Sequence, residues 1–257
     1  MKFSIVTPSY NQGQYIEETI NSVISQKGDF DIEYFIMDGS STDNTVAILK
    51  KYSKNLSKNP RISFYWQSKK DSGQVDALNQ GLAKTNGDVI AYINSDDYYL
   101  PNAFNTVAKY FESHPKSLWL VGNCQVSNPR LAWTFFLKHL WPIQCFKDAL
   151  YVFNTINQPS VFLKKPLVDK VGKFNSDYHY AFDYDYWLRC LKFGLPSRIF
   201  NGLSVFRIHE KSKGNTGFIA QFTEDRIILN NYYPNIIERK LHDFGKYLVS
   251  HIYKKIK

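Results

Sequence analysis

The sequence predicts an α/β protein in which one mostly parallel sheet is flanked by helices and followed by a C-terminal helical extension. Three observations support this fold class. Strand and helix patterns alternate through the first half of the chain, the strand segments are short and apolar, and polar or acidic residues follow several of them directly. Such alternation is typical of parallel sheets that are covered by helices on both faces.

Five strands and four helices are expected in the first half. The strand segments are residues 3–7, 32–37, 62–66, 89–93 and 118–121. Apolar residues at helical spacing mark the helices between them. These positions are Ile16, Ile20, Val23 and Ile24; Val46, Leu49 and Tyr52; Val75, Leu78 and Leu82; and Phe104, Val107, Ala108 and Phe111. Glu17 and Glu18 in the first of these helices and Pro101 before the last fit helix N-termini.

The second half is less regular. Residues 159–163 and 199–208 are expected as strands, and residues 184–193 as a helix. Residues 131–151 are rich in Trp, Phe and Leu with interspersed Lys. This stretch fits the core, a contact in a homodimer, or a site for a lipid-linked acceptor, and the sequence leaves the three open.

A long amphipathic helix is expected at the C-terminus. Its apolar positions are Ile237, Leu241, Phe244, Leu248 and Ile252. The last 22 residues hold six basic residues against two acidic ones. The helix either packs on the main domain, which is slightly favoured, or holds anionic lipid at a membrane surface. We divide the chain into a main domain, residues 1–210, and an extension, residues 211–257.

Charge and cysteine usage restrict the partners and the compartment. The 32 basic and 23 acidic residues give a net charge of +9, which favours anionic partners such as phosphorylated small molecules. Three scattered cysteines without a CxxC pair fit neither a disulfide framework nor a zinc site. The N-terminus turns polar after six residues, unlike a signal peptide, and no run of 18 apolar residues occurs. We expect a cytoplasmic location, with peripheral contact at the cytoplasmic face of the inner membrane.

Polar side chains follow three of the predicted strands. They are Thr7, Pro8 and Ser9 after the first, Asp38 after the second, and Asp96 and Asp97 after the fourth. Ligands of open parallel sheets bind beyond the carboxyl ends of the strands, so we expect these residues to share one crevice. Two adjacent carboxylates repel each other unless a cation offsets them, and Mn²⁺ or Mg²⁺ takes oxygen ligands and bridges diphosphate oxygens. A solvated turn is the alternative.

Four further residues are candidates, each with a structural alternative. Asp71 precedes a helix and is either a ligand contact or its cap. Asp183 and Asp185 stand where a carboxylate could take a proton as a general base, or where helix N-terminal acids simply suit the dipole. His209 is either a metal or phosphate contact, or a structural histidine.

Taken together, these segments resemble family 2 glycosyltransferases with the GT-A fold, over roughly residues 3–210 and in family order. The matching segments are IVTPSYN at residues 5–11, DGSSTDNT at 38–45, DSGQ at 71–74, ALNQG at 77–81 and GDVIAYINSDD at 87–97. The resemblance implies a nucleotide-binding half, residues 1–125, and an acceptor half, residues 126–210. Because several segments match in register, the likeness is more specific than any one motif.

The resemblance also implies site roles. Thr7, Pro8 and Ser9 would line the nucleotide pocket, Asp38 would bind a uracil or thymine base, and Asp71 would close the pocket. Asp97 would bind the metal directly, and Asp96 would bind ribose or reach the metal through water. His209 would lie near the pyrophosphate. Asp183 is the first choice for the general base and Asp185 the second.

The activity implied is inverting transfer of a sugar from a UDP- or dTDP-sugar to a saccharide or lipid-linked saccharide, as in bacterial surface-polysaccharide assembly. No QxxRW motif of processive synthases occurs, which argues for single transfer.

Rival classes lack their own signatures. No G-x-G-x-x-G or G-K-[ST] motif is found, and the loop after the first strand is not the Gly-rich, basic loop of a nucleotidyltransferase. The positive charge is dispersed or lies at the tail while the predicted cleft is acidic, so we expect no nucleic-acid partner. A non-catalytic binding module with this fold would not need Asp97 and Asp183.

Overall fold

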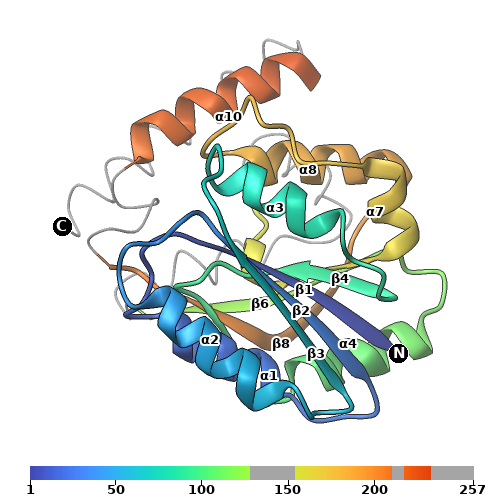
Figure 1. Cartoon of the computed structure of the whole chain (residues 1–257). Helices are drawn as coiled ribbons and strands as arrows, with labels where there is room; N and C mark the ends of the chain where they lie inside the picture. The colour runs from blue at the N-terminus through green and yellow to red at the C-terminus, as the bar shows by residue number, and fades with distance from the viewer. Residues whose placement is uncertain (128–153, 210–216, 233–257) are drawn as a thin grey trace.

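A single eight-stranded sheet forms the centre of the protein (Figure 1). The computed structural model describes residues 1–127, 154–209 and 217–232. The strands are β1 (Lys2–Ser9), β2 (Asp31–Asp38), β3 (Ile62–Ser68), β4 (Val89–Tyr92), β5 (Tyr98–Tyr99), β6 (Trp119–Val126), β7 (Val161–Lys164) and β8 (Ser197–Phe206). Their order in the sheet is β3-β2-β1-β4-β7-β6-β8-β5.

The first four strands in that order are parallel, and β6 also pairs with β8 in parallel. The pairings of β4 with β7, β6 with β7, and β5 with β8 are antiparallel. The predicted α/β class with a mostly parallel sheet is therefore confirmed, and the antiparallel pairings lie in the half of the sheet beyond β4. In the parallel half, the carboxyl ends of β1, β2 and β3 align, since Ser9 pairs with Asp38 and Asp38 with Ser68.

Helices cover both faces of the sheet. They are α1 (Ile16–Ile24), α2 (Thr45–Leu56), α3 (Gln74–Leu82), α4 (Ala103–Ser113), α7 (Lys165–Val171), α8 (Phe182–Cys190) and α10 (Phe218–Tyr232), with short 3-10 turns at Gln158–Ser160 and Leu191–Phe193. Figure 1 shows α1, α2 and α4 on one face and α3, α7, α8 and α10 on the other.

Two apolar cores result, one on each side of the sheet. Side chains of β1 point alternately to the two sides of the sheet. Phe3 and Ile5 pack in the core with α1, α2 and α4, and Val6 packs in the core with α3, α7 and α8. A strand that is buried on both faces needs apolar residues at successive positions, which is why β1, β2 and β4 read as apolar runs.

Three described elements were not predicted from the sequence. Residues 98–99, to which the sequence analysis assigned no strand, form β5 and pair with β8. Helix α7 was missed although it has a proline in its first turn. Helix α10 lies in the predicted helical extension, residues 211–257, but no helix was assigned at its position because its apolar residues do not gather into one stripe. The predicted segments 131–151 and 237–252 lie outside the described residues. No helix in the described part of the chain is long and apolar enough to cross a bilayer.

Glu33 is a buried charge on β2 that holds the turn before β4. Its carboxylate accepts hydrogen bonds from the backbone N–H groups of Asn86 (2.7 Å) and Gly87 (3.1 Å), and it pairs with the Lys2 ammonium at 2.7 Å. Burial raises the pKa of Glu33, but these hydrogen bonds outweigh burial and leave the pKa below its ordinary value. The folded state therefore gains stability above the unfolded-state pKa and loses it as the pH falls.

We expect Glu33→Gln to lower the free energy of unfolding by about 1–3 kcal/mol at pH 7, because a charged acceptor of several hydrogen bonds is lost. The difference from wild type should shrink as the pH falls below the ordinary glutamate pKa of about 4, because the unfolded state takes up a proton there before the folded state does. Urea unfolding at several pH values measures both effects. Glu112→Gln, the same change at an exposed site on α4, is the control. A difference that stays constant down to pH 3 would contradict the assignment.

Candidate active site

Asp38 is the last residue of β2, and the Asp71 carboxylate lies close to the residue that follows it, Gly39. The Asp38 carboxylate is buried and accepts hydrogen bonds from the Ser41 N–H (3.0 Å), the Ser41 hydroxyl and the Ser68 hydroxyl (2.6 Å). A Cβ added at Gly39 would lie 2.9 Å from the Asp71 carboxylate, so the Asp71 side chain is held close against the backbone that follows Asp38. A carboxylate has about four acceptor positions, which leaves Asp38 one for a ligand.

Hydrogen bonds join the loop after β1 to the loop after β2. Asn11 and Ser40 both adopt left-handed backbone conformations, with φ of 51° and 67°. The Asn11 N–H donates to the Ser41 hydroxyl (2.7 Å), and the Asn11 side chain accepts from the Thr42 N–H (2.8 Å). Such conformations persist where neighbouring contacts fix them, and often mark ligand sites.

The three residues at the end of β1 are all buried. The Thr7 hydroxyl lies 3.0 Å from the Tyr34 hydroxyl, so its side chain forms a hydrogen bond inside the core. The buried Ser9 hydroxyl has no hydrogen-bond partner among the described residues. An unsatisfied buried hydroxyl costs about 1–3 kcal/mol, so Ser9 is a donor that a bound ligand could satisfy.

Asp97 is fully buried after β4. Its carboxylate accepts hydrogen bonds from the Arg207 N–H (2.8 Å) and from the Asn94 side chain (3.3 Å), which in turn accepts one from Gln74 on α3 (2.7 Å). Burial, with a further contribution from the negative charge of Asp96, raises the pKa of Asp97 well above its ordinary value. A buried carboxylate beside a second one fits a divalent cation, because a cation offsets both charges.

His209 and Arg207 complete this side of the site. His209 Nε2 lies 3.0 Å from the Asp96 carboxylate, and its ring packs on Tyr15 at 4.7 Å between centroids. The Arg207 guanidinium lies over the ring of Tyr15 (5.0 Å) and pairs with Glu18 at 2.6 Å. Arg207 was missed as a site residue, although it stands only two residues before the candidate His209.

Within residues 1–127, 154–209 and 217–232, no three His, Cys, Asp or Glu side chains are grouped so as to hold a metal ion by themselves. Asp97, with Asp96 and His209 beside it, could therefore hold a cation only with oxygen atoms from a ligand or water. Diphosphate oxygens suit this role, since Mg²⁺ and similar ions are commonly bound by one or two carboxylates plus substrate phosphates.

Asp183 and Asp185, both in the first turn of α8, have different surroundings. Asp185 is 3% exposed, and its carboxylate accepts hydrogen bonds from Arg189 Nε (2.9 Å) and the Tyr232 hydroxyl (2.9 Å). Asp183 is half-buried and lies 3.5 Å from the Asn154 amide nitrogen. Asp185 therefore belongs to a structural network that joins α8 to α10, whereas Asp183 is the more accessible of the two.

Tyr92, at the end of β4, links the two acidic sides of the site. Burial raises the pKa of Tyr92 well above its ordinary value, and the negative charges of Asp183 and Asp97 raise it further. Phe182, which precedes Asp183 on α8, lies near the Tyr92 ring with 6.3 Å between the ring centroids. Asp183 therefore lies close to the end of β4, the strand that precedes Asp97.

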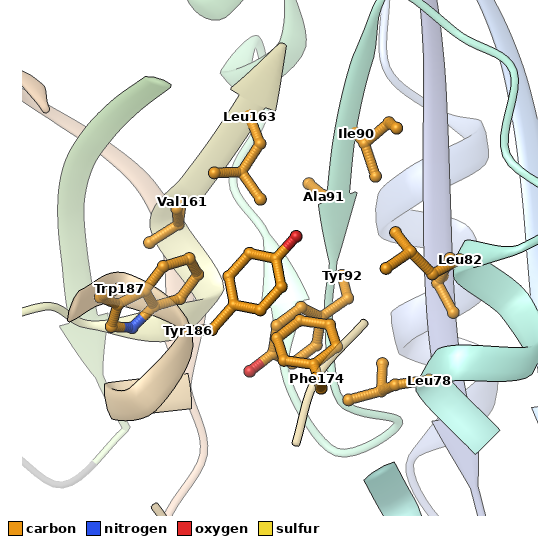
Figure 2. Close-up of a pocket in the computed structure, with 11 residues that line it drawn as sticks. Leu78, Leu82, Ile90, Ala91, Tyr92, Val161, Leu163, Phe174, Tyr186 and Trp187 are labelled. Atoms are coloured by element: carbon orange, nitrogen blue, oxygen red, sulfur yellow. The ribbon is translucent and has the colours of Figure 1, made fainter. Parts of the chain in front are cut away.

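A small apolar cavity lies beneath this edge and is not a ligand site. It measures about 10 Å³, the size of roughly one water molecule. Figure 2 shows its lining, which includes Leu78 of α3, Leu163 of β7 and Trp187 of α8. The rings of Tyr92 and Phe174 fill the space beside it (Figure 2). The cavity is a packing void between the sheet and the helices.

Comparison with known proteins identifies the family. The model of the family described as "Glycosyl transferase family 2" matches residues 4–162. An uncharacterized glycosyltransferase of Mycobacterium tuberculosis (strain ATCC 25618 / H37Rv) is 29% identical over 194 residues, which are 72% of this chain and 67% of the relative. A PGL/p-HBAD biosynthesis glycosyltransferase of Mycobacterium bovis (strain BCG / Pasteur 1173P2) is 27% identical over 192 residues, 73% of this chain and 69% of the relative.

Solved structures agree in fold. S. aureus TarS 1-349 in complex with UDP-GlcNAc superimposes with a TM-score of 0.66 and 18% identity, over 94% of this chain and 70% of that one. The mannosyltransferase PcManGT from Pyrobaculum calidifontis, in complex with GDP-Man and Mn²⁺, superimposes with a TM-score of 0.64 and 14% identity. This match covers 94% of this chain and 72% of that one. The chain spans only 41% of the longer TarS chain.

The helix-flanked sheet thus matches the GT-A fold of glycosyltransferases, as the sequence predicted. The family match covers more than half of the 257 residues. This protein belongs to glycosyl transferase family 2.

Proposed function

We propose that this glycosyltransferase moves a single sugar from a nucleoside-diphosphate sugar to a saccharide or lipid-linked saccharide, with inversion at the anomeric carbon. The observation that carries the proposal is the gathering of acidic side chains at one edge of the sheet. Asp38 ends β2 and the Asp71 carboxylate lies close to the next residue, Gly39. The buried Asp97 lies beyond β4, and Asp183 follows Phe182, which lies near Tyr92 of β4.

A UDP- or dTDP-sugar is the proposed donor. The remaining acceptor position of Asp38 suits the ring N–H of uracil or thymine, and Asp71 lies beside it across Gly39. The similar TarS 1-349 was solved with UDP-GlcNAc and PcManGT with GDP-Man, so a nucleotide-sugar donor has precedent on this fold.

Mn²⁺ or Mg²⁺ is the proposed cofactor, held by Asp97 directly and by Asp96 through water, with His209 beside Asp96. When bound, the ion offsets the charge that develops on the departing diphosphate. The raised pKa of Asp97 supports this assignment, because a buried carboxylate without a countercharge is costly and a bound cation removes that cost.

The transfer itself is one displacement. The oxygen of the acceptor hydroxyl forms a bond to the anomeric carbon, and the bond from that carbon to the diphosphate oxygen breaks on the opposite side. The diphosphate leaves with the bonding electrons, and the hydroxyl proton passes to the Asp183 carboxylate. The amide of Asn154 lies 3.5 Å from that carboxylate and orients it.

We further place the reaction in the assembly of bacterial cell-surface glycans, at the cytoplasmic face of the membrane. A similar protein is named a PGL/p-HBAD biosynthesis glycosyltransferase, so a part in biosynthesis has precedent among the relatives. Contact with the membrane through the C-terminal segment, and a homodimer, remain proposals from the sequence.

A thermal-shift screen of UDP-, dTDP- and GDP-sugars, each with Mn²⁺ or with EDTA, tests the donor site. We expect one nucleotide class to raise the melting temperature with Mn²⁺ and to do so weakly or not at all with EDTA. A ligand at 100 times its Kd stabilises the fold by about 2.7 kcal/mol, which is readily measured. Equal stabilisation in EDTA would contradict the metal assignment, and no response to any nucleotide would contradict the donor site.

A further inference from the structure

We infer that Glu224, on α10, is a positioning residue that holds the segment bearing the general base in place. The inference rests on the proposed function, because it assigns the base to Asp183. It gives α10 a part in catalysis, although that helix lies beyond residues 4–162 matched by the family model and beyond residues 1–210 predicted as the catalytic domain.

The Glu224 carboxylate binds three successive backbone N–H groups just before α8. One oxygen accepts from the His179 N–H (2.9 Å), and the other accepts from Tyr180 (2.6 Å) and Ala181 (2.8 Å). Ala181, the last of the three, is the residue at the N-cap of α8, and its methyl side chain offers no acceptor. N–H groups where a helix begins have no partner within the helix, and the Ala181 N–H finds one in a carboxylate from a distant helix.

Charge favours this arrangement. Hydrogen bonds to an ionised acceptor are roughly twice as strong as neutral ones, and a negative group at a helix N-terminus is further stabilised by the helix dipole. Three such bonds fix the backbone at residues 179–181, two residues before Asp183. Asp183 stands in the first turn of α8, and this turn cannot shift without breaking the bonds to Glu224.

Helix α10 also holds α8 on the other side of Asp183. The Tyr232 hydroxyl donates to Asp185 (2.9 Å), and Ile228 is buried in the same core as Phe182. In Figure 1, α10 lies across the end of α8 and above α3. The base is therefore fixed from α10 at points two residues before it and two residues after it.

The held segment also contacts the donor side. The His179 ring lies against Gly73, where an added Cβ would be 3.6 Å from the ring. The Gly73 N–H donates to Asp71 (2.9 Å), which borders the proposed nucleotide pocket. By fixing the backbone of His179, Glu224 sets the position of the base relative to the loop that would close over the donor.

Glu224→Gln tests the inference, because glutamine keeps the volume but replaces one acceptor oxygen with an NH₂ group that faces backbone donors. The activity measured is release of nucleoside diphosphate from the donor selected by the thermal-shift screen, with Mn²⁺ and with water in place of the acceptor. Misplacing a reacting group by about 1 Å can cost roughly 100-fold in rate, so we expect kcat to fall about 10- to 100-fold. We expect the donor KM to stay within about twofold, because Glu224 makes no contact with the residues assigned to the nucleotide.

Glu224→Asp should recover part of the lost kcat, since it restores the charge on a shorter side chain. Glu112→Gln, the same change at an exposed carboxylate on α4, should leave kcat and KM unaltered. A kcat within twofold of wild type in Glu224→Gln, or a parallel loss of nucleotide-induced stabilisation, would overturn the positioning role.

Amide hydrogen exchange separates this inference from the proposed function. The N–H groups of residues 179–181 should exchange at least about tenfold faster in Glu224→Gln, while those of β1 and β2 keep their wild-type rates. Unchanged exchange at residues 179–181 would refute the hold on the backbone whatever the activity. If wild-type protein consumed no donor, the proposed function would fail, and the exchange rates would still decide whether Glu224 holds this segment.

Discussion

Asp97→Asn is expected to reduce sugar transfer by at least about 10³-fold while leaving the protein folded. A metal ion that stabilises the leaving diphosphate contributes several kcal/mol to the transition state, and each 1.36 kcal/mol is tenfold in rate. Asparagine keeps the shape of the side chain but loses the charge that would bind the cation. Steady-state release of nucleoside diphosphate at saturating Mn²⁺ measures the loss, and the nucleotide-induced thermal shift should lose its dependence on metal.

The melting temperature without metal distinguishes this outcome from unfolding. Asp97 is a fully buried carboxylate beside Asp96, and burial raises its pKa, so its charge opposes folding in the metal-free protein. Removing that charge should leave the melting temperature unchanged or raise it. Turnover that stays within tenfold of wild type in a well-folded Asp97→Asn protein would remove Asp97 from the metal site.

Asp183→Asn should lower kcat by about 10² to 10⁴-fold without weakening donor binding, because general base catalysis contributes roughly that factor. The acceptor hydroxyl would then lose its proton to water instead of to a placed carboxylate. The measurement is kcat, with the donor KM and the thermal shift as checks on binding.

Asp185→Asn is the matched comparison, since the same change is made two residues away on the same helix. Asp185 is buried and bonded to Arg189 and Tyr232. Breaking a buried ion pair typically costs about 3–5 kcal/mol, so its main effect should be on the free energy of unfolding. If Asp185→Asn removed turnover without loss of stability and Asp183→Asn did not, the two assignments would have to be exchanged.

The sequence by itself determined the parallel half of the sheet. Residues 3–7, 32–37, 62–66 and 89–93 were predicted as strands and form the interiors of β1 to β4, with the last prediction one residue longer than β4. Three of these strands, β1, β2 and β4, are buried on both faces, and such strands carry apolar residues at successive positions, so their signal is local and can be read without the fold. The fourth, β3, lies at the sheet edge and is partly exposed. The place of Asp38 at the rim followed from the same pattern, because parallel strands end at a common edge.

Only the tertiary structure shows how fully Asp185 is bonded compared with Asp183, and only it revealed the contacts of Glu224. The pairing of Asp185 with Arg189, four residues on, can be read from the sequence. The bond from Tyr232 to Asp185 cannot, because it comes from α10, which the apolar pattern did not predict. Contacts between residues more than 40 positions apart leave no periodic trace in the sequence, since they depend on how helices pack and not on how each one forms.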